Sequence, residues 1–313
     1  MVLKRGEVVL ERYHRDVRLC ADDEESPPPH GPQRQYPLAS VAKSISSTLL
    51  GFALAEMSPT ADGVIDPGLL EQPLDKYLVE LDADSSQGGY ADVPIDRVLR
   101  MRSGARFKEY GWWSDAERLY RQVVDKNTRD RTFAEFAQQV KPRWFGAGGF
   151  NYAGLDTAVL GLLTERLVGG GEHLGAYLER KLWQPLGMAE DAVWKIDLAG
   201  TPASYCCLGA SLPDLARFGQ FVLDRGRNRA GDQLLPASWF GLATRRRPGV
   251  DDAIPNGNGS FNAGCPLDYH YQWWGFKEPR DDFTAVGIAG QFIHVLPSAG
   301  VVIVQVSDWG KWE

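Results

Sequence analysis

Ser40 and Lys43 stand three residues apart at the start of an otherwise apolar stretch, LASVAKSISSTLLGFAL (residues 38–54). Residues i and i+3 of a helix share a face, so the hydroxyl and the amine would lie side by side. A serine hydroxyl becomes a nucleophile when a neighbouring base removes its proton, and burial can lower the pKa of a lysine enough for that task. The same residues would also fit an N-cap serine followed by a lysine that reaches solvent.

The residues after Ser40 predict a buried helix. Val41, Ile45, Leu49 and Phe52 follow helical spacing, and small or apolar residues surround them on most sides. At the start of such a helix, free backbone N–H groups and the helix dipole favour negative charge on a bound group. The position of Ser40 therefore suits a nucleophile that generates an oxyanion.

Other catalytic patterns do not occur in the chain. It contains neither a G-x-S-x-G elbow nor an H-E-x-x-H motif. The five histidines are scattered, which does not favour a Ser-His-Asp triad or a metal centre; they are His14, His30, His173, His270 and His294. We therefore expect no metal and no cofactor.

The composition limits the class of protein. The chain has 313 residues and a net charge of -7, which argues against general binding to nucleic acids or anionic membranes. The local basic run Arg245–Arg247 is expected to be a solvated surface. No apolar run of ~18 residues and no signal peptide occurs, so we expect a cytoplasmic protein. Four cysteines, of which Cys206 and Cys207 are adjacent, are expected to be reduced thiols.

The order of the expected elements predicts an α+β fold. Residues 2–13 read as two strands around a turn, and residues 284–296 and 301–307 are also strand-like. Between them the chain is mainly helical. We expect an antiparallel sheet built by the two chain ends (residues 1–36 and 201–313) with a mainly helical part (37–200), all in one domain of residues 1–313.

Several segments together resemble one known family, the class C β-lactamase and penicillin-binding-protein-like serine hydrolases. LASVAKSISSTLLGFAL resembles the active-site helix of that family, and the other landmarks follow in the family's order along nearly the whole chain. They are VLRMRSGARF, FNYAGLDTAVLGLLTERLVG, YLERKLWQPLGM, DLARFGQFVLDRGR, LLPASWF and GIAGQFIHVLPSAGVVIVQVSD. The YQWWGF and GIAGQ segments look closest to the branch of 6-aminohexanoate-dimer hydrolases and related esterases, whose fold is α+β.

The resemblance implies a role for each matching residue. Ser40 would be the acylated nucleophile, and Lys43 with Tyr152 would form the general base, Tyr152 then acting as acid toward the leaving group. The backbone N–H groups of Ser40 and Gln291 would form the oxyanion hole. A lysine ammonium beside Tyr152 would lower the pKa of that tyrosine.

The sequence departs from the family pattern at the substrate site. Ile288-Ala289-Gly290 lacks the cationic residue that recognises a substrate carboxylate, and Gly154 replaces an expected Asn or Ser. These changes favour an esterase or amidase acting on a small molecule. Gly154, Ala289 and Gly290 are expected to contact substrate, and Trp112 and Trp113 either wall the site or pack on the surface.

Two other functions stay open. One is a true β-lactamase or D,D-peptidase, and the other is a non-catalytic binding protein on the same fold. The family's terminal helices are expected to be absent, because the chain starts and ends close to strands. Neither the substrate nor the oligomeric state follows from the sequence.

Overall fold

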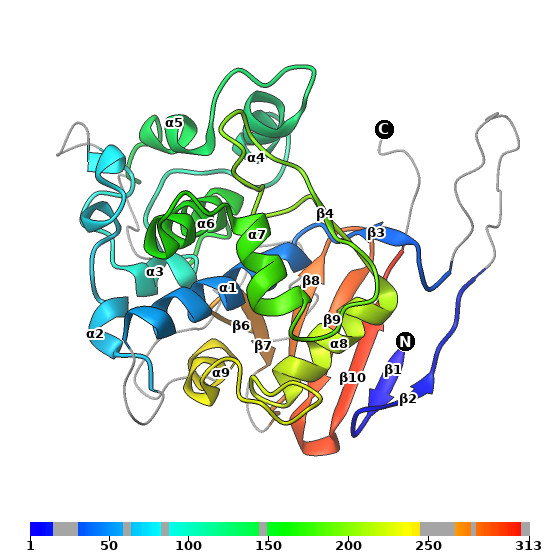
Figure 1. Ribbon diagram of the computed structural model, residues 1–313. Coiled ribbons are helices and arrows are strands. Elements are labelled where there is room, and N and C mark those ends of the chain that lie inside the picture. Colours follow the sequence, from blue (N-terminus) through cyan, green and yellow to red (C-terminus); the bar gives the residue numbers. More distant parts are fainter. Residues whose placement is uncertain are drawn as a thin grey trace, which may run out of the picture.

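The two chain ends meet in one antiparallel sheet, as the sequence predicts. The computed structural model describes residues 1–14, 31–58, 64–82, 88–143, 149–244, 267–276 and 280–307. The large sheet has the strand order β2-β1-β10-β9-β8-β7-β6 (Figure 1). Its strands are β1 (Val2–Lys4), β2 (Glu7–Leu10), β6 (Leu267–His270), β7 (Trp273–Phe276), β8 (Phe283–Gly287), β9 (Gln291–Leu296) and β10 (Val301–Gln305). The α+β fold class is confirmed.

A second, smaller sheet has the order β3-β5-β4. It contains β3 (Gln35–Pro37), β4 (Val193–Trp194) and β5 (Leu208–Ser211). The pairing of β3 with β5 joins the segment that enters the Ser40 helix to a segment about 170 residues later in the chain. This small sheet therefore fixes the start of that helix.

The helices fill the middle of the sequence and cover the sheet (Figure 1). The longest are α1 (Val41–Met57), α6 (Gly154–Val168) and α8 (Leu212–Leu223). The shorter ones are α2 (Pro67–Leu70), η1 (Leu74–Lys76), η2 (Val79–Asp82), α3 (Ile95–Leu99), α4 (Asp115–Leu119), η3 (Tyr120–Val124), α5 (Phe133–Gln138), α7 (Leu174–Leu178), η4 (Glu179–Trp183), α9 (Ala237–Thr244) and η5 (Pro297–Ala299).

Local signals explain several of these boundaries. The Ser211 side chain accepts a hydrogen bond from the Asp214 backbone at the start of α8, and Thr132 and Glu135 form a capping box at α5. Gly169, with a φ of 71°, ends α6 in a conformation that glycine adopts without strain. These ends agree with the sequence predictions.

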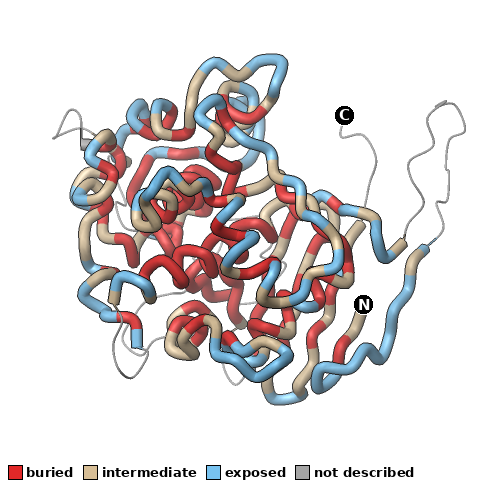
Figure 2. Tube along the Cα trace, viewed as in Figure 1, coloured by how far each residue is buried: buried red, intermediate tan, exposed pale blue. Residues whose placement is uncertain are grey.

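Helix α1 runs through the centre of the molecule. All its residues from Val41 to Leu54 are buried, and it packs on α6 and against β8 and β9 (Figure 2). Helix α8 also packs on the sheet, at Ile293 and Val302, where Gly219 allows close approach. The predicted central helix is thus confirmed, and it carries Lys43 into the core.

The packing of α1 on Trp239 gives a stability prediction. A Cβ added at Gly51 would lie 2.6 Å from Cε2 of the buried Trp239 ring. Gly51→Ala should therefore lower the free energy of unfolding by about 1–3 kcal/mol through overpacking. A Cβ added at the control position Gly175 would lie 3.9 Å from its nearest neighbour, Pro202 Cγ. Gly175→Ala should therefore change stability by less than about 1 kcal/mol. Urea unfolding of both variants measures the difference, and equal effects would contradict the packing argument.

The structure corrects the expectation of free thiols. Cys206 and Cys207 form a disulfide between adjacent residues, just before β5.

Among the described residues, no helix is long and apolar enough to cross a membrane. The basic run Arg245–Arg247 lies outside the described residues. The division at residues 36 and 200 between the sheet part and the mainly helical part stays a prediction.

Candidate active site

Ser40 lies at a sharp strand-to-helix turn. Leu38, directly after β3, donates its backbone N–H to the Leu208 carbonyl, and α1 begins at Val41. Between them Ala39 has a φ of 46°, a left-handed conformation that costs a non-glycine residue on the order of 1–3 kcal/mol. The Ser40 side chain makes no capping hydrogen bond, so the N-cap interpretation of this serine does not hold. Its hydroxyl is free for another contact.

Lys43 supplies that contact from one turn further along α1. Its Nζ donates hydrogen bonds to Ser40 Oγ and to the Tyr205 carbonyl, each 2.9 Å long. The side chain does not reach solvent, since Lys43 is only 1% exposed. Burial lowers the pKa of Lys43 to about 8, although the nearby Glu109 carboxylate acts in the opposite direction. A large fraction of this amine is therefore neutral near pH 8 and able to accept a proton.

Tyr152 lies just before α6 and faces the same pair. Lys43 Nζ is 5.0 Å from the centroid of its ring, and the Ser40 side chain acts to lower the pKa of its hydroxyl. The expected direction of its pKa was wrong. Burial raises the pKa of Tyr152 well above its usual value, and Tyr110 and Glu109 raise it further, against the smaller effect of Ser40. Tyr152 is therefore a neutral phenol at neutral pH.

Glu109 is a member of the site that sequence reasoning missed. Its carboxylate accepts a hydrogen bond of 2.6 Å from the Gly154 backbone N–H. Burial raises the pKa of Glu109, while Lys43 and the Gly154 N–H lower it in part. The segment FKEYGWW gives no signal for this role, because a glutamate between landmark motifs normally indicates a solvated loop.

Gly154 proves to be a structural position in the site. A Cβ at this residue would lie 2.8 Å from the Tyr205 ring and 3.3 Å from a Glu109 carboxylate oxygen. The ring and the carboxylate therefore occupy the space that a larger side chain would need. Gly154 is also buried, and its contact with substrate stays a prediction. Its absent side chain makes room for Glu109.

The turn between β8 and β9 approaches the residues that precede Ser40 at Gly287. A Cβ added to Gly287 would lie 2.5 Å from the Leu38 carbonyl oxygen and 3.2 Å from Ala39 Cβ. Gln291 pairs with Gly287 across the hairpin and is buried beside it. The contacts of Ala289 and Gly290 instead run toward Gln305 and Ser307 near the end of β10. The structure thus brings Gly287 and Gln291 near the start of α1, while Ala289 and Gly290 contact the end of β10.

Aromatic side chains surround Tyr152. Its ring stacks on Trp274 (centroids 5.4 Å apart) and on Tyr110 (6.1 Å), and Tyr269 meets it edge to face at 5.9 Å. These rings give Tyr152 an apolar surrounding on several sides. Trp112 and Trp113 are 91% and 92% exposed, and their role at the site stays a prediction.

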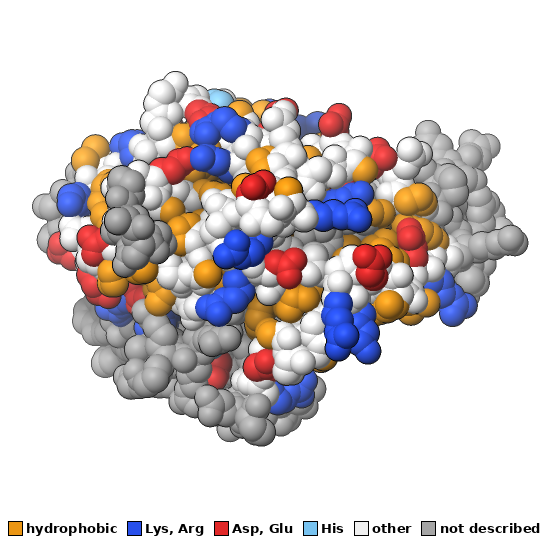
Figure 3. All heavy atoms as spheres, turned by 60° about the horizontal axis from the view of Figure 1, so that its bottom comes forward, with side chains coloured by type: hydrophobic (Ala, Val, Ile, Leu, Met, Phe, Trp, Pro, Cys, Tyr) orange, Lys and Arg blue, Asp and Glu red, His pale blue; other side chains and the backbone are white. Residues whose placement is uncertain are grey.

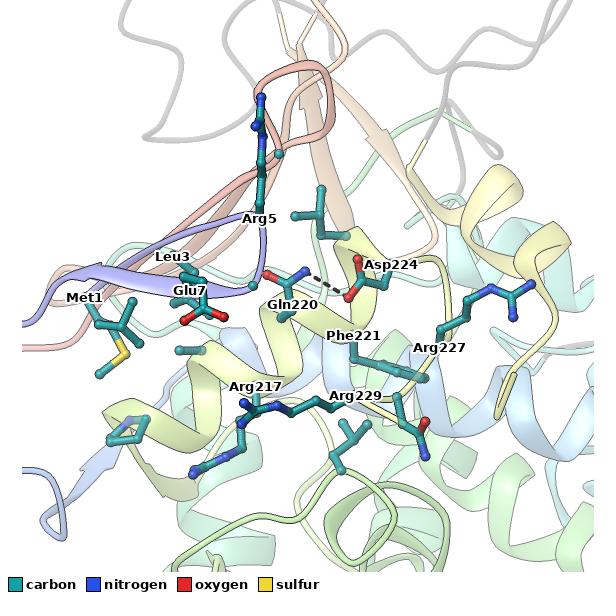
Figure 4. A pocket seen from close by; sticks show the side chains of 18 of the residues that line it. Met1, Leu3, Arg5, Glu7, Arg217, Gln220, Phe221, Asp224, Arg227 and Arg229 are labelled. Carbon is teal, nitrogen blue, oxygen red and sulfur yellow. Dashed lines mark hydrogen bonds between the residues drawn. The ribbon is translucent and has the colours of Figure 1, made fainter. Parts of the chain in front are cut away.

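A hollow with a volume of about 970 Å³ lies away from these residues, and none of the predicted site residues lines it. Figure 4 shows it between α8 and the β1–β2 hairpin, with Arg5, Arg217, Arg229, Glu7 and Asp224 among its lining residues. On the face turned forward in Figure 3, acidic and basic side chains are interspersed.

Within the described residues no group of three or more His, Cys, Asp or Glu side chains could hold a metal ion.

Comparison with known proteins gives consistent relatives. A family model described as Beta-lactamase matches residues 1–313. The chain is 28% identical to the 6-aminohexanoate-dimer hydrolase of Paenarthrobacter ureafaciens, over 97% of this chain and 71% of that protein. A solved structure from Bacillus anthracis, provisionally named a 6-aminohexanoate-dimer hydrolase, aligns with a TM-score of 0.74 at 23% identity, over 98% of this chain and 72% of the other. EstCE1, a hydrolase with promiscuous acyltransferase activity, aligns with a TM-score of 0.67 at 15% identity, over 97% and 86% of the two chains. At these identities, the two structures support the fold.

Proposed function

Because this chain belongs to the Beta-lactamase family, a hydrolase family, we propose that it is a serine hydrolase that cleaves an ester or amide bond of a small molecule through an acyl-enzyme. The observation that carries the proposal is the 2.9 Å contact between Ser40 Oγ and the amine of Lys43, which is buried. A buried lysine is costly unless it is paired or used. Here it is placed where a nucleophile needs a base.

In the proposed acylation step, neutral Lys43 accepts the Ser40 proton as Oγ attacks the substrate carbonyl. Tyr152, a neutral phenol, donates its proton to the leaving group. The resulting tyrosinate lies beside the new Lys43 ammonium, which stabilises it. Transfer of the proton from Lys43 to Tyr152 then restores both groups. Water then attacks the acyl carbonyl while Lys43 and Tyr152 accept its proton, and they return that proton to Ser40 Oγ as the acid product leaves.

The oxyanion of the tetrahedral intermediate needs two preorganised N–H donors. We assign one to the Ser40 backbone, at the free end of α1. The second comes from the β8–β9 turn, where Gln291 is the residue predicted from the sequence. The approach of Gly287 to Leu38 and Ala39 also favours the N–H of Ile288, the next residue along the turn. Backbone donors tolerate the changed side chains of this turn.

Glu109 is proposed as a residue that positions the base. Its carboxylate raises the pKa of Lys43, and its bond to the Gly154 N–H holds it at the start of α6. The pKa of Lys43 on α1 therefore depends on a carboxylate that is held by the segment next to Tyr152.

The substrate class follows from the walls of the site and from the relatives. Tyr110, Tyr269 and Trp274 offer apolar surface beside Tyr152, which suits an acyl group of low polarity. The relatives named above include a 6-aminohexanoate-dimer hydrolase and a hydrolase with acyltransferase activity. We therefore favour an esterase or amidase over a β-lactamase or D,D-peptidase. Faster hydrolysis of nitrocefin than of p-nitrophenyl acyl esters would reverse that preference.

A fluorophosphonate probe tests the proposed nucleophile. We expect one covalent adduct per chain, mapped by peptide mass spectrometry to Ser40. Ser44→Ala serves as the control, because Ser44 lies on the same helix but bonds the Gln272 carbonyl. This variant should be labelled like the natural chain. A folded protein that takes up no probe would favour the alternative of a non-catalytic binding protein.

The pH dependence of kcat/KM tests the role of Lys43. The neutral amine is the active form, so kcat/KM should rise with pH through a midpoint near 8, the pKa of Lys43. Glu109 raises that pKa, so Glu109→Gln should move the midpoint to lower pH as well as slow the reaction. Glu117→Gln, which changes an exposed residue on α4, should leave the midpoint in place. A midpoint that does not move in Glu109→Gln would contradict the assigned role of Glu109.

A further inference from the structure

The turn Ala203–Cys207 lies directly behind the proposed base. It connects β4 to β5, and two of its carbonyls accept hydrogen bonds from side chains of α1. Lys43 Nζ donates to the Tyr205 carbonyl over 2.9 Å, and Ser46 Oγ donates to the Ser204 carbonyl over 2.8 Å. The position of the Lys43 amine relative to Ser40 therefore depends on the shape of this turn.

The other side of the turn is held by β4 and the residue after it. Trp194 Nε1 donates to the carbonyls of both Ala203 and Cys206, at 2.9 Å each. The Lys195 backbone N–H donates to the Cys207 carbonyl over 3.2 Å. The turn is thus fixed between β4 and α1, and a change in its backbone would be transmitted to Lys43.

The Cys206–Cys207 disulfide closes a small covalent ring within this turn, one residue after Tyr205. Cys207 has a φ of 65°, in the left-handed region that a non-glycine residue adopts only when its surroundings hold it there. Both cysteines are half-buried, so part of the ring is accessible to solvent. The bond joins side chains that no function proposed above uses.

We propose that the Cys206–Cys207 disulfide is a redox-controlled modification site that sets the reactivity of Ser40 through the Tyr205 carbonyl and Lys43. The oxidised pair holds the turn in the shape that accepts the Lys43 hydrogen bond. The reduced pair frees Cys207 from its left-handed conformation and weakens that hydrogen bond. This inference rests on the proposed function, because it takes Lys43 to be the base for Ser40.

The chemistry is thiol–disulfide exchange with a dithiol as the reductant. One thiolate of the reductant attacks one sulfur of the pair, which breaks the Cys206–Cys207 bond and forms a mixed disulfide. The second thiolate of the reductant then displaces the protein sulfur and closes the reductant's own disulfide. Two electrons pass from the reductant to the cysteine pair, and the two released thiolates take up two protons. Reoxidation by a disulfide reverses each step.

The test compares oxidised and dithiothreitol-reduced protein for the rate at which a fluorophosphonate labels Ser40. Iodoacetamide trapping and peptide mass spectrometry report the state of Cys206 and Cys207 in the same samples. We expect Cys206 and Cys207 to resist alkylation before reduction and both to be alkylated after it. Labelling of Ser40 should be about tenfold slower in the reduced protein. Reoxidation should restore the rate. Phenylarsine oxide, which bridges two neighbouring thiols, should bind only the reduced pair.

Two double variants test whether the response to reductant comes from Cys206 and Cys207 or from the other two cysteines. The double variant Cys206→Ser, Cys207→Ser should label Ser40 at one rate with or without reductant. The double variant Cys20→Ser, Cys265→Ser should keep the full response, and circular dichroism verifies that each sample is folded. Equal labelling rates in both redox states, or free thiols at Cys206 and Cys207 before reduction, would overturn this inference alone. Absence of a Ser40 adduct in every state would overturn the proposed function, and this inference with it.

Discussion

Replacement of Ser40 by alanine should reduce kcat on any ester or amide substrate by at least about 10⁴-fold. The hydroxyl that Lys43 contacts at 2.9 Å is the group that forms the acyl-enzyme, and no other group can replace it in that position. Rates of p-nitrophenyl ester hydrolysis measure the effect. The loss should appear in kcat and not only in KM, because the chemical step itself is removed.

The control for this variant is Ser47→Ala. Ser47 lies on the same buried helix, and its hydroxyl bonds the Tyr271 carbonyl. It should cost some stability while leaving kcat within a few-fold of the natural value. If folded Ser40→Ala retained most of its turnover, the acyl-enzyme mechanism on this helix would be refuted.

Tyr152→Phe should lower kcat by roughly 10²–10⁴-fold, the usual range for loss of a general acid. The ring and its stacking on Trp274 and Tyr110 would survive the change, so the variant removes the hydroxyl alone. Substrates with better leaving groups should suffer less, because they need less protonation as they depart. A series of phenyl esters with leaving groups of graded pKa measures that dependence.

Tyr177→Phe is the matched control for the loss of a phenol. Tyr177 is fully buried, and its hydroxyl bonds Glu56 at the far end of α1. Its removal should affect stability and leave the dependence on leaving group unchanged. A Tyr152→Phe variant with the natural rate on poor leaving groups would show that another group supplies the proton.

The sequence alone determined the features that depend on neighbours along the chain. Ser40 and Lys43 are three residues apart on one helix, so helical geometry already places their side chains together. The apolar surroundings of Lys43 in the sequence predicted a buried helix, but they left open whether the amine itself reaches solvent. The caps of α5 and α8, the β1–β2 hairpin and the α+β order of elements follow from similarly local patterns.

Only the tertiary structure decided which distant residues complete the site. Glu109 and Trp274 reach Tyr152 and Lys43 from separate loops and strands, and no spacing in the sequence connects them. The prediction from the sequence took only the charge of Lys43 into account, and it therefore had the wrong direction for the pKa of Tyr152. Burial, and the groups that the fold gathers around that phenol, outweigh the charge and raise the pKa. The desolvation of a side chain depends on how the whole core packs around it, so it cannot be predicted from the types of the residues that neighbour it in the sequence.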